Sequence, residues 1–289
     1  AGYSRYRRAG TGGAGGERGL EVTRVAVLQV DSAGEPEAAH AMALAALEEA
    51  ADCGAELAVL PEYASGWAPT LGPELAVPDE GGFVAALGEV ARRRGITVVA
   101  GVVTAAAGRT GGADDRCLNL ALLIGPDGAV SGRYAKVHLF DAFGTRESDA
   151  LQAGDPAAAP LVADVGGLRF GMLTCYDLRF PESARRLADA GAQVIVAIAA
   201  WASGPGKVDQ LRVLARARAM ENTSYLLLAS QHGVGRAGHS AVVDPLGVVL
   251  AEAGDDPAVL VADLDGDVVR RVRERVPVLA HRRYGVVPR

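Results

Sequence analysis

The segment LRFGMLTCYDLRFP, residues 168–181, joins two kinds of secondary structure at a single thiol. Its apolar first half predicts a buried strand that ends at Thr174, and Pro181 predicts the first turn of a helix. Cys175 therefore stands at a strand-to-helix junction, where a turn exposes the sulfur and neighbouring backbone N–H groups favour the thiolate. Because a lone thiol is more often a buried structural cysteine, this segment alone leaves both interpretations open.

The composition predicts a folded chain with a large core. Of the 289 residues, 49% are hydrophobic, which is enough for one large domain, and we place that domain at residues 22–289. The net charge is −6, the pI is about 5.5, and Lys and Arg are scattered rather than clustered. A nucleic acid is therefore not expected as a partner.

The three cysteines, at positions 53, 117 and 175, lie far apart and lack the spacing of metal ligands. An odd, sparse set argues against a disulfide framework, so we expect a protein of the reducing cytoplasm that needs no metal. Arg7 and Arg8 precede a glycine-rich stretch without an apolar core, which predicts a flexible tail over residues 1–21 rather than an export signal. No run is long and apolar enough to cross a bilayer, so no membrane partner is expected.

Hydrophobic periodicity divides the rest of the chain into strands and helices. The predicted strands lie at residues 25–30, 57–60, 96–103, 117–124, 129–134, 161–165, 168–174, 193–199, 225–231, 239–243, 248–251 and 258–264. The predicted helices lie at residues 36–53, 83–94, 181–191, 208–221 and 268–275. Residues 106–116 and 141–156 are expected to be loops, and an irregular tail is expected from Pro277 onward.

This order of elements predicts mixed sheets in an α/β fold. Buried strands of parallel type alternate with helices in both halves, and hairpins are interspersed, so helices should cover one side of each sheet. The pattern alone is compatible with two mixed sheets or with one doubly wound sheet. Glu62 and Cys175 each follow the C-terminal end of a buried strand, which is where sites form in α/β folds.

A cysteine hydrolase needs a base for the thiol proton and donors for the oxyanion. Among the histidines His138 is the best candidate, because Lys136 lies two residues before it on a predicted strand and shares its face. The alternative for His138 is an imidazole hydrogen-bonded in the core or at the site wall. Glu62 is the better base, since a carboxyl group directly after a buried strand and a proline is partly desolvated. Lys136 supplies a cation for the oxyanion, although Glu62, Lys136 and Glu147 taken singly also fit structural or surface roles.

An ordered set of motifs resembles the nitrilase, or carbon–nitrogen hydrolase, superfamily. The motifs are LAVLPEY (57–63), GRYAKVHLFDAFG (132–144), ESD (147–149), LTCYDLRFPE (173–182), AWASGPGK (200–207), LARARAMENTSY (214–225), GHSAVVDPLG (238–247) and VPVLAHRR (276–283). The resemblance implies an α-β-β-α sandwich, a triad of Glu62, Lys136 and Cys175, and a second glutamate at Glu147. It also implies a homodimer or a larger even oligomer that associates through helices near the nucleophile.

The local pattern is most similar to the Nit branch, which includes omega-amidase and deaminated-glutathione amidase. That branch commonly has His-Trp before its R-A-R-A segment, whereas this chain has Asp209-Gln210, so no particular amide is carried over. The implied reaction is hydrolysis of a non-peptide C–N bond in a small carboxylate-bearing amide, through a thioester, with release of ammonia and no cofactor. N-carbamoyl amino-acid hydrolysis and nitrile hydrolysis remain alternatives, and so does a non-catalytic binding or scaffold protein.

In the implied mechanism Glu62 accepts the proton of Cys175, and the thiolate attacks the carbonyl carbon. Lys136 and the backbone N–H of Tyr176 then hold the oxyanion. Glu147 would orient the substrate, the water or the Lys136 ammonium. No metal takes part in these steps.

Two further residues within the motifs have open roles. For Arg179 we expect an ion pair with Asp177 or another acid, and the alternative is a fork that binds a substrate carboxylate. Trp201 either forms a wall of the pocket or packs beneath it. Substrate specificity is expected to lie in the loops at residues 66–80 and 142–153.

Overall fold

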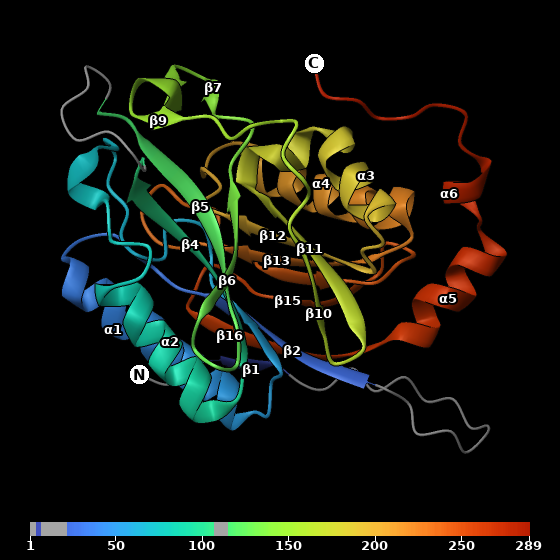
Figure 1. Ribbon diagram of the computed structural model, residues 1–289, viewed down its shortest axis with the longest axis horizontal. Helices are drawn as coiled ribbons and strands as arrows, with labels where there is room; N and C mark the ends of the chain where they lie inside the picture. Colours follow the sequence, from blue (N-terminus) through green and yellow to red (C-terminus); the bar gives the residue numbers. More distant parts are fainter. Residues whose placement is uncertain (1–3, 7–21, 107–114) are drawn as a thin grey trace.

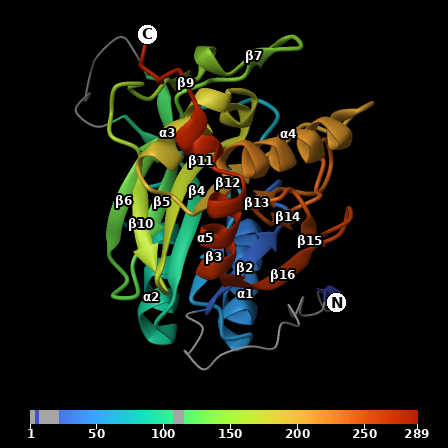
Figure 2. The ribbon, with the colours of Figure 1, turned by 90° about the vertical axis from the view of Figure 1, so that its right-hand side faces the viewer.

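The computed structural model describes residues 4–6, 22–106 and 115–289. Two β-sheets lie face to face, and helices cover the outer face of each sheet (Figure 1). The α-β-β-α sandwich is therefore confirmed, and the alternative of one doubly wound sheet does not apply. Figure 2 shows the four layers from the side, with α1 and α2 on one outer face and α3 and α4 on the other.

The first sheet carries three parallel strands in its centre, β2, β3 and β4. In spatial order it consists of β1 (Ser4–Tyr6), β16 (Ala258–Asp265), β2 (Val22–Gln29), β3 (Leu57–Val59), β4 (Thr97–Ala105), β5 (Cys117–Ile124) and β6 (Val130–Ala135), with β9 (Leu151–Gln152) pairing with β5. The neighbours of the parallel strands, β16 and β5, run antiparallel to them. The sheet is thus mixed, as predicted.

The second sheet repeats this plan. In spatial order it consists of β10 (Val162–Val165), β11 (Leu168–Thr174), β12 (Val194–Ala199), β13 (Tyr225–Ser230), β14 (Ala241–Val243) and β15 (Val249–Glu252). Strands β11, β12 and β13 are parallel, and the outer pairs are antiparallel. A separate two-stranded ribbon joins β7 (Asp141–Ala142) to β8 (Thr145–Arg146).

The helices are interspersed with the strands along the chain, and two of them follow the last strand. They are α1 (Pro36–Asp52), α2 (Gly82–Arg94), α3 (Pro181–Asp189), α4 (Lys207–Asn222), α5 (Gly266–Arg275) and α6 (Val278–His281), with 3₁₀ helices at Pro73–Leu75, Glu147–Asp149 and Cys175–Arg179. Proline opens α1 and α3, where its missing N–H group costs no helical hydrogen bond. Gly95 ends α2 in the left-handed conformation that glycine adopts without a steric penalty.

Strands with both faces buried create three layers of core. Along β2, Val27 faces the opposite sheet, and Leu28 faces α1 and α2. Along β12, Val196 faces the first sheet, and Ile195 faces α3 and α4. Because successive side chains of a strand point to opposite faces, continuous apolar runs are what two helix-covered sheets require.

Most predicted elements are confirmed within a few residues, and three expectations need correction. Strand β6 ends at Ala135, so Lys136 and His138 do not lie on one strand. The segment at residues 141–156, expected to be a loop, contains β7, β8, β9 and a 3₁₀ helix. The segment expected to be irregular from Pro277 begins with the single turn α6.

Two expectations fall largely outside the described residues. Of the tail at residues 1–21, only Ser4–Tyr6 is described, and it pairs in parallel with β16. Of the loop at residues 106–116, positions 107–114 lie outside the described part of the chain.

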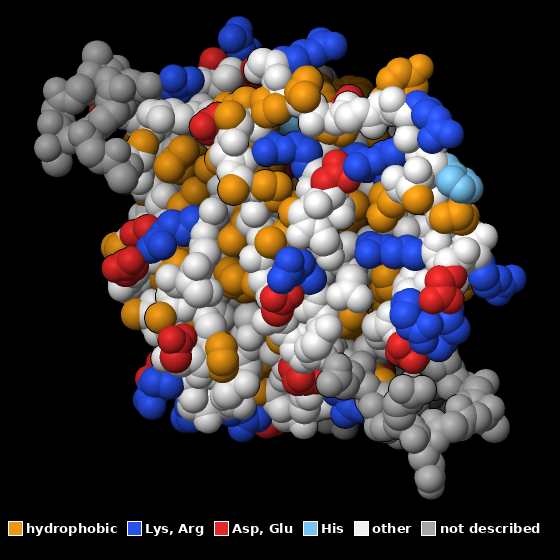
Figure 3. All heavy atoms as spheres, turned by 45° about the vertical axis from the view of Figure 1, so that its right-hand side comes forward, with side chains coloured by type: hydrophobic (Ala, Val, Ile, Leu, Met, Phe, Trp, Pro, Cys, Tyr) orange, Lys and Arg blue, Asp and Glu red, His pale blue; other side chains and the backbone are white. Residues whose placement is uncertain are grey.

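Charged side chains of both signs are mixed on the surface. On the face drawn in Figure 3, Lys and Arg are interspersed with Asp, Glu and uncharged groups. The basic helix α5 carries its own acids, since Arg270 contacts Asp267 and Glu274. Within the described residues, no helix combines the length and the apolar character needed to cross a bilayer.

Candidate active site

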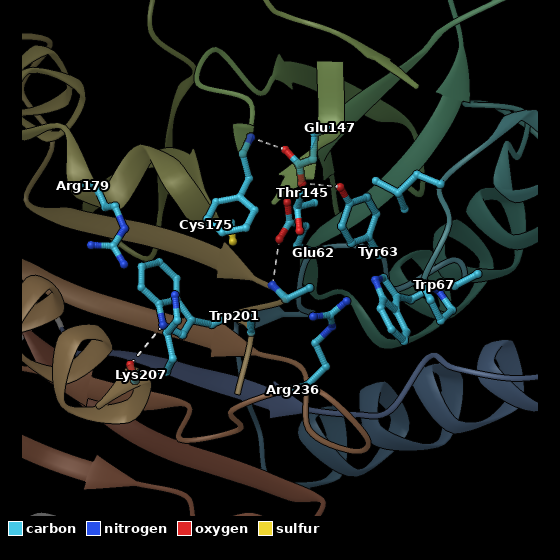
Figure 4. Close-up of a pocket in the computed structure, with 16 residues that line it drawn as sticks. Glu62, Tyr63, Trp67, Thr145, Glu147, Cys175, Arg179, Trp201, Lys207 and Arg236 are labelled. Carbon is cyan, nitrogen blue, oxygen red and sulfur yellow. Dashed lines mark hydrogen bonds between the residues drawn. The ribbon is translucent and has the colours of Figure 1, made fainter. Parts of the chain in front are cut away.

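A cavity of about 270 Å³ opens where the two sheets present the C-terminal ends of their parallel strands. Its lining residues are Glu62, Tyr63, Trp67, Ala68, Pro69, Leu71, Phe140, Thr145, Glu147, Cys175, Arg179, Ala200, Trp201, Ala202, Lys207 and Arg236. Both loops in which we expected specificity to lie contribute to this lining. In Figure 4 the sulfur of Cys175 faces the carboxylate of Glu62 across the centre of the cavity.

Cys175 is the first residue after β11 and has a φ of 48°, a conformation that side chains other than glycine rarely adopt. The turn is held by Asp177, whose carboxylate accepts the N–H of Thr174 at 3.0 Å. Burial raises the pKa of the Cys175 thiol well above its ordinary value, and the charge of Glu62 raises it further, while Lys136 opposes this. The raised pKa favours the protonated thiol over the thiolate.

Glu62 is fixed by hydrogen bonds to both carboxylate oxygens. Oε1 accepts from Nδ2 of Asn119 at 2.7 Å and from Nζ of Lys136 at 2.9 Å, and Oε2 accepts from the N–H of Ala200 at 2.7 Å. The partners come from β5, from the segment after β6 and from the end of β12, so both sheets hold the same side chain. Glu62 is 1% exposed, which keeps its carboxylate in one position against the thiol.

Lys136 joins Glu62 to the second glutamate. Its Nζ contacts Oε1 and Oε2 of Glu147 at 3.0 and 2.8 Å. Glu147 also accepts from the hydroxyl of Tyr63 at 3.0 Å and from the N–H of Phe140 at 2.7 Å. Burial alone would lower the pKa of Lys136, but the charges of Glu62 and Glu147 outweigh burial and raise this pKa well above its ordinary value. Lys136 is therefore a permanent cation between two carboxylates.

Replacing Gly101 by alanine is expected to displace Glu62. A Cβ atom at this position of β4 would lie 2.5 Å from Cα of Glu62 and 2.6 Å from the carbonyl oxygen of Pro61. We expect a loss of about 1–3 kcal/mol in the free energy of unfolding and a fall in kcat of roughly 100-fold, measured by urea denaturation and steady-state assay. Gly254→Ala is the matched control, because no atom lies within 4 Å of its added Cβ. Normal kcat in Gly101→Ala would show that the backbone of Glu62 tolerates movement.

The folded protein is expected to lose stability as the pH rises through the alkaline range. The pKa of Cys175 is raised by burial, so the folded state keeps a proton that the unfolded chain releases from about pH 8.5 upward. The stabilisation is complete below the unfolded pKa and declines by about 1.4 kcal/mol per pH unit between the unfolded and folded pKa values. When the free energy of unfolding is measured by urea titration at a series of pH values, its decline with pH should therefore be shallower by this amount in Cys175→Ala than in the native protein. Identical slopes would contradict the raised pKa of Cys175.

His138 is not among the residues that line the cavity, so the structure gives no support to His138 as the base. Its Nδ1 lies 2.7 Å from Oδ1 of Asp177, and its ring stacks on Phe180 with centroids 3.7 Å apart. Asp177 also accepts the hydroxyl proton of Tyr134 at 2.7 Å. His138 therefore has the role that the alternative gave it, a hydrogen-bonded imidazole beside the site that supports the turn of Cys175.

Tyr176 is not among the lining residues, and its ring packs edge-on against Phe140, which lines the cavity, and against Phe180. The role expected of Tyr176 uses only its backbone N–H, which follows Cys175 directly. That role remains a proposal. Trp201 is a wall residue of the cavity, is 4% exposed, and donates its indole N–H to the carbonyl of Lys207 at 3.0 Å.

The ion pair expected between Arg179 and Asp177 is wrong. Arg179 donates to Oε1 of Gln210 at 2.7 Å, lies over the Trp201 ring at 4.9 Å, and has no carboxylate partner among the described residues. Asp177 is already occupied by Tyr134 and His138. The guanidinium instead reaches the cavity, where its buried Nε has no hydrogen-bond partner within the described part of the chain.

Sequence reasoning missed several lining residues, of which Trp67, Lys207 and Arg236 carry the most chemistry. Lys207 lies over the Phe143 ring at 3.5 Å, and Arg236 lies over the Trp67 ring at 3.7 Å. Lys207 was part of a quoted motif, but nothing in the motif indicates that it lines the cavity. In residues 4–6, 22–106 and 115–289, no cluster of three or more His, Cys, Asp or Glu side chains is arranged to hold a metal ion.

Residues 24–274 match the sequence model of the carbon–nitrogen hydrolase family. The chain is 37% identical over 245 residues to the deaminated glutathione amidase of Synechocystis, covering 79% of this chain and 86% of that protein. Its structure resembles that of Nit3 from Saccharomyces cerevisiae, a member of the nitrilase superfamily, with a TM-score of 0.79, 28% identity, and coverage of 93% of this chain and 100% of Nit3.

A second similar structure carries a modified cysteine. It is a variant of the amidase from Nesterenkonia that shows the Michael addition of acrylamide at the active-site cysteine. The chain resembles it with a TM-score of 0.71 and 29% identity, covering 88% of this chain and 98% of the amidase.

Proposed function

Because the chain belongs to the carbon–nitrogen hydrolase family, we propose that it hydrolyses a small carboxylate-bearing amide with Cys175 as nucleophile. The observation that supports this most directly is the contact set at the cavity floor, where Glu62, Lys136 and Glu147 surround the thiol. The reducing cytoplasm and an even homo-oligomer, expected from the sequence, are part of the same proposal.

In the first half of the reaction, Glu62 accepts the proton of Cys175 while the sulfur bonds to the carbonyl carbon. Lys136 and the N–H of Tyr176 bind the oxyanion, and each such donor lowers the barrier by about 3 kcal/mol. Lys136 has a donor to spare for this step, because Glu147 keeps its bonds to Tyr63 and Phe140 when one ammonium N–H turns away. The C–N bond then breaks, Glu62 gives its proton to the departing nitrogen, and a thioester remains.

In the second half, water attacks the thioester carbon and Glu62 accepts a proton from that water. The same donors bind the second oxyanion. The C–S bond breaks, the carboxylic acid leaves, and the sulfur takes the proton back from Glu62. Glu62 thus alternates between base and acid, which its fixed position permits without movement of the chain.

The substrate carboxylate is assigned to the corner of the cavity that Arg179 and Lys207 form. Burial lowers the pKa of Lys207, and the nearby charge of Arg179 lowers it further. Arg179 and Lys207 repel each other, and neither has a carboxylate partner among the described residues. An anion bound between them would offset this repulsion. Gln210, where this chain departs from the commoner His-Trp, holds Arg179 in this corner. The relative named deaminated glutathione amidase supports an amide as the substrate.

The proposal is tested on a panel of omega-keto-amides, deaminated glutathione, N-carbamoyl amino acids, neutral aliphatic amides and nitriles. Product acids and ammonia are both measured, so that a leaving group larger than ammonia is also detected. Arg179→Gln should raise KM for the best carboxylate-bearing amide by about 10- to 100-fold and change KM for a neutral amide far less. Arg212→Gln is the matched control, since Arg212 pairs with Glu252 on the surface of α4. If only neutral amides are hydrolysed, the proposed substrate carboxylate is refuted. If no compound of the panel is hydrolysed, the interpretation as a non-catalytic scaffold is favoured.

A further inference from the structure

Gln231 is a buried amide that connects the turn at Glu62 to the opposite sheet. It directly follows β13 of the second sheet (Figure 1) and is 0% exposed. Its Nε2 donates to the carbonyl of Glu62 at 2.6 Å and to the carbonyl of Tyr63 at 3.1 Å. Because two carbonyl oxygens require two donors, these partners fix the orientation of the amide. The side chain therefore binds the first sheet from the second.

The turn that Gln231 contacts has a strained backbone. Tyr63 has a φ of 57°, a conformation that side chains other than glycine adopt only when the surrounding structure enforces it. The next residue, Ala64, donates its N–H to the carbonyl of Gly101 at 2.7 Å, which attaches the turn to β4 of the first sheet. The donors from the second sheet come from Gln231. Loss of these donors would allow the turn to relax and Glu62 to move with it.

Gln231 also positions a donor of the Glu62 carboxylate. Its backbone N–H donates to the carbonyl of Ala199, the last residue of β12, at 2.9 Å. The following residue, Ala200, donates its N–H to Oε2 of Glu62 at 2.7 Å. Gln231 thus contacts both the backbone of Glu62 and the strand end that binds its carboxylate. Gln231 is not among the residues that line the described cavity, so its effect on a bound substrate is indirect.

We infer that Gln231 is a positioning residue that holds Glu62 against Cys175 from the second sheet. The inference rests on the proposed function, because it concerns the base that this reaction requires. A base displaced by about 1 Å loses roughly 100-fold in rate, whereas the walls that bind the substrate stay in place. The expected signature is a fall in kcat without a comparable rise in KM.

The first test replaces the amide by a side chain of similar length that has no donor. Gln231→Met should lower kcat for the best amide of the panel by about 30- to 100-fold and change KM by less than about threefold. Gln29→Met is the matched control, because Gln29 is also 0% exposed and its Nε2 also donates to two carbonyls, those of Gly254 and Asp256. The control should lose a comparable amount of stability to urea but keep the native kcat. Equal losses of kcat in both variants, or native kcat in Gln231→Met, would overturn the inference.

Gln231→Glu tests the donor itself. When protonated, the new carboxyl group donates to one of the two carbonyls, and when ionised it repels both. Burial beside two carbonyl oxygens raises the pKa of this carboxyl group above the ordinary value of about 4.3. The deficit in kcat relative to the native protein should therefore shrink by about fivefold or more between about pH 8 and pH 5. The deficit of Gln231→Met should not change with pH.

Other titrations of the site do not affect this comparison. The ionisable groups around the turn are Glu62, Tyr63, Lys136, Glu147, Cys175 and Arg236. They are common to the native protein and to both variants, so their own titration cancels in the ratio of kcat values. A deficit that is independent of pH in both variants would mean that the donor of Gln231 is not required, which would overturn the inference.

A measurement without substrate separates this inference from the function on which it rests. Alkylation of Cys175 by iodoacetamide, measured by mass spectrometry at a series of pH values, reports the ionisation of the thiol. The charge of Glu62 raises the pKa of Cys175, so displacement of Glu62 in Gln231→Met should shift the alkylation midpoint to lower pH by about 0.5 pH unit or more. Gln29→Met should keep the native midpoint. If no amide of the panel is hydrolysed, the proposed function fails, while a shifted midpoint still supports Gln231 as the residue that positions Glu62. An unchanged midpoint in Gln231→Met overturns the inference.

Discussion

Replacing Cys175 by alanine is expected to abolish hydrolysis of every substrate that the protein accepts, by about 10⁵-fold or more in kcat. Cys175 carries the only thiol among the residues that line the described cavity, and the remaining groups can bind and polarise a carbonyl but cannot form a thioester. The measurement is product formation at saturating substrate. Ligand binding by the same variant should persist, because the cationic corner and the wall at Trp201 are unchanged.

Two companion measurements distinguish the chemical role from a structural one. Mass spectrometry after incubation with iodoacetamide should show alkylation of Cys175, and a ligand that fills the cavity should protect it. Cys53→Ala is the matched control, since this half-exposed thiol follows α1 far from the site, and its loss should leave kcat unchanged. Residual turnover in Cys175→Ala above about 1% of the native rate would overturn the thioester mechanism, which gives the thiol a covalent role.

The sequence alone was sufficient for most of the strands and helices, because apolar periodicity and glycine or proline breaks are local signals. Strand β12, for example, is apolar throughout, and only a strand buried on both faces requires that pattern. The choice between two sheets and one was not local. It depends on whether β2 and β12 face each other through Val27 and Val196, and the hydrophobic periodicity of a single strand does not indicate which strand lies opposite.

In the candidate site, too, the position of some residues could be predicted from local sequence and the position of others could not. Glu62 and Cys175 follow buried strands, so their location at strand ends could be predicted. Lys136 and His138 were expected to share a face, but the chain leaves β6 at Ala135, and the two side chains then point to different partners. The end of a strand is set by tertiary contacts, here the bonds to Glu62 and Glu147, and local sequence does not encode them.

The positions of the cations in the cavity were the hardest to predict from the sequence. Arg236 is 61 residues after Cys175 in the sequence (236 − 175), in a loop whose glycines indicate a turn but not its direction. Its position depends on hydrogen bonds to the segment after β12. The expected partner of Arg179 was wrong because Asp177 had nearer donors in Tyr134 and His138. Pairing of long charged side chains is a property of the assembled fold.

Replacing Lys136 by methionine is expected to damage both stability and catalysis. The side chain is fully buried between Glu62 and Glu147, so its loss leaves two carboxylates without their shared cation. Removing one partner of a buried ion pair costs about 3–5 kcal/mol in the free energy of unfolding. Loss of the oxyanion donor should lower kcat by about 10²- to 10³-fold in addition. Urea denaturation and steady-state kinetics measure the two effects separately.

A second substitution separates these two effects. In Lys136→Met/Glu147→Gln the additional unpaired charge is removed, so part of the lost stability should return, whereas kcat should stay low because no ammonium faces the oxyanion. The surface ion pair of Arg133 with Asp79 gives the scale for comparison, and Arg133→Met should cost about 1 kcal/mol or less. Recovery of kcat in the double variant would mean that Lys136 only neutralises Glu147. Recovery of stability alone would mean that this one ammonium both balances the buried charges and takes part in the reaction.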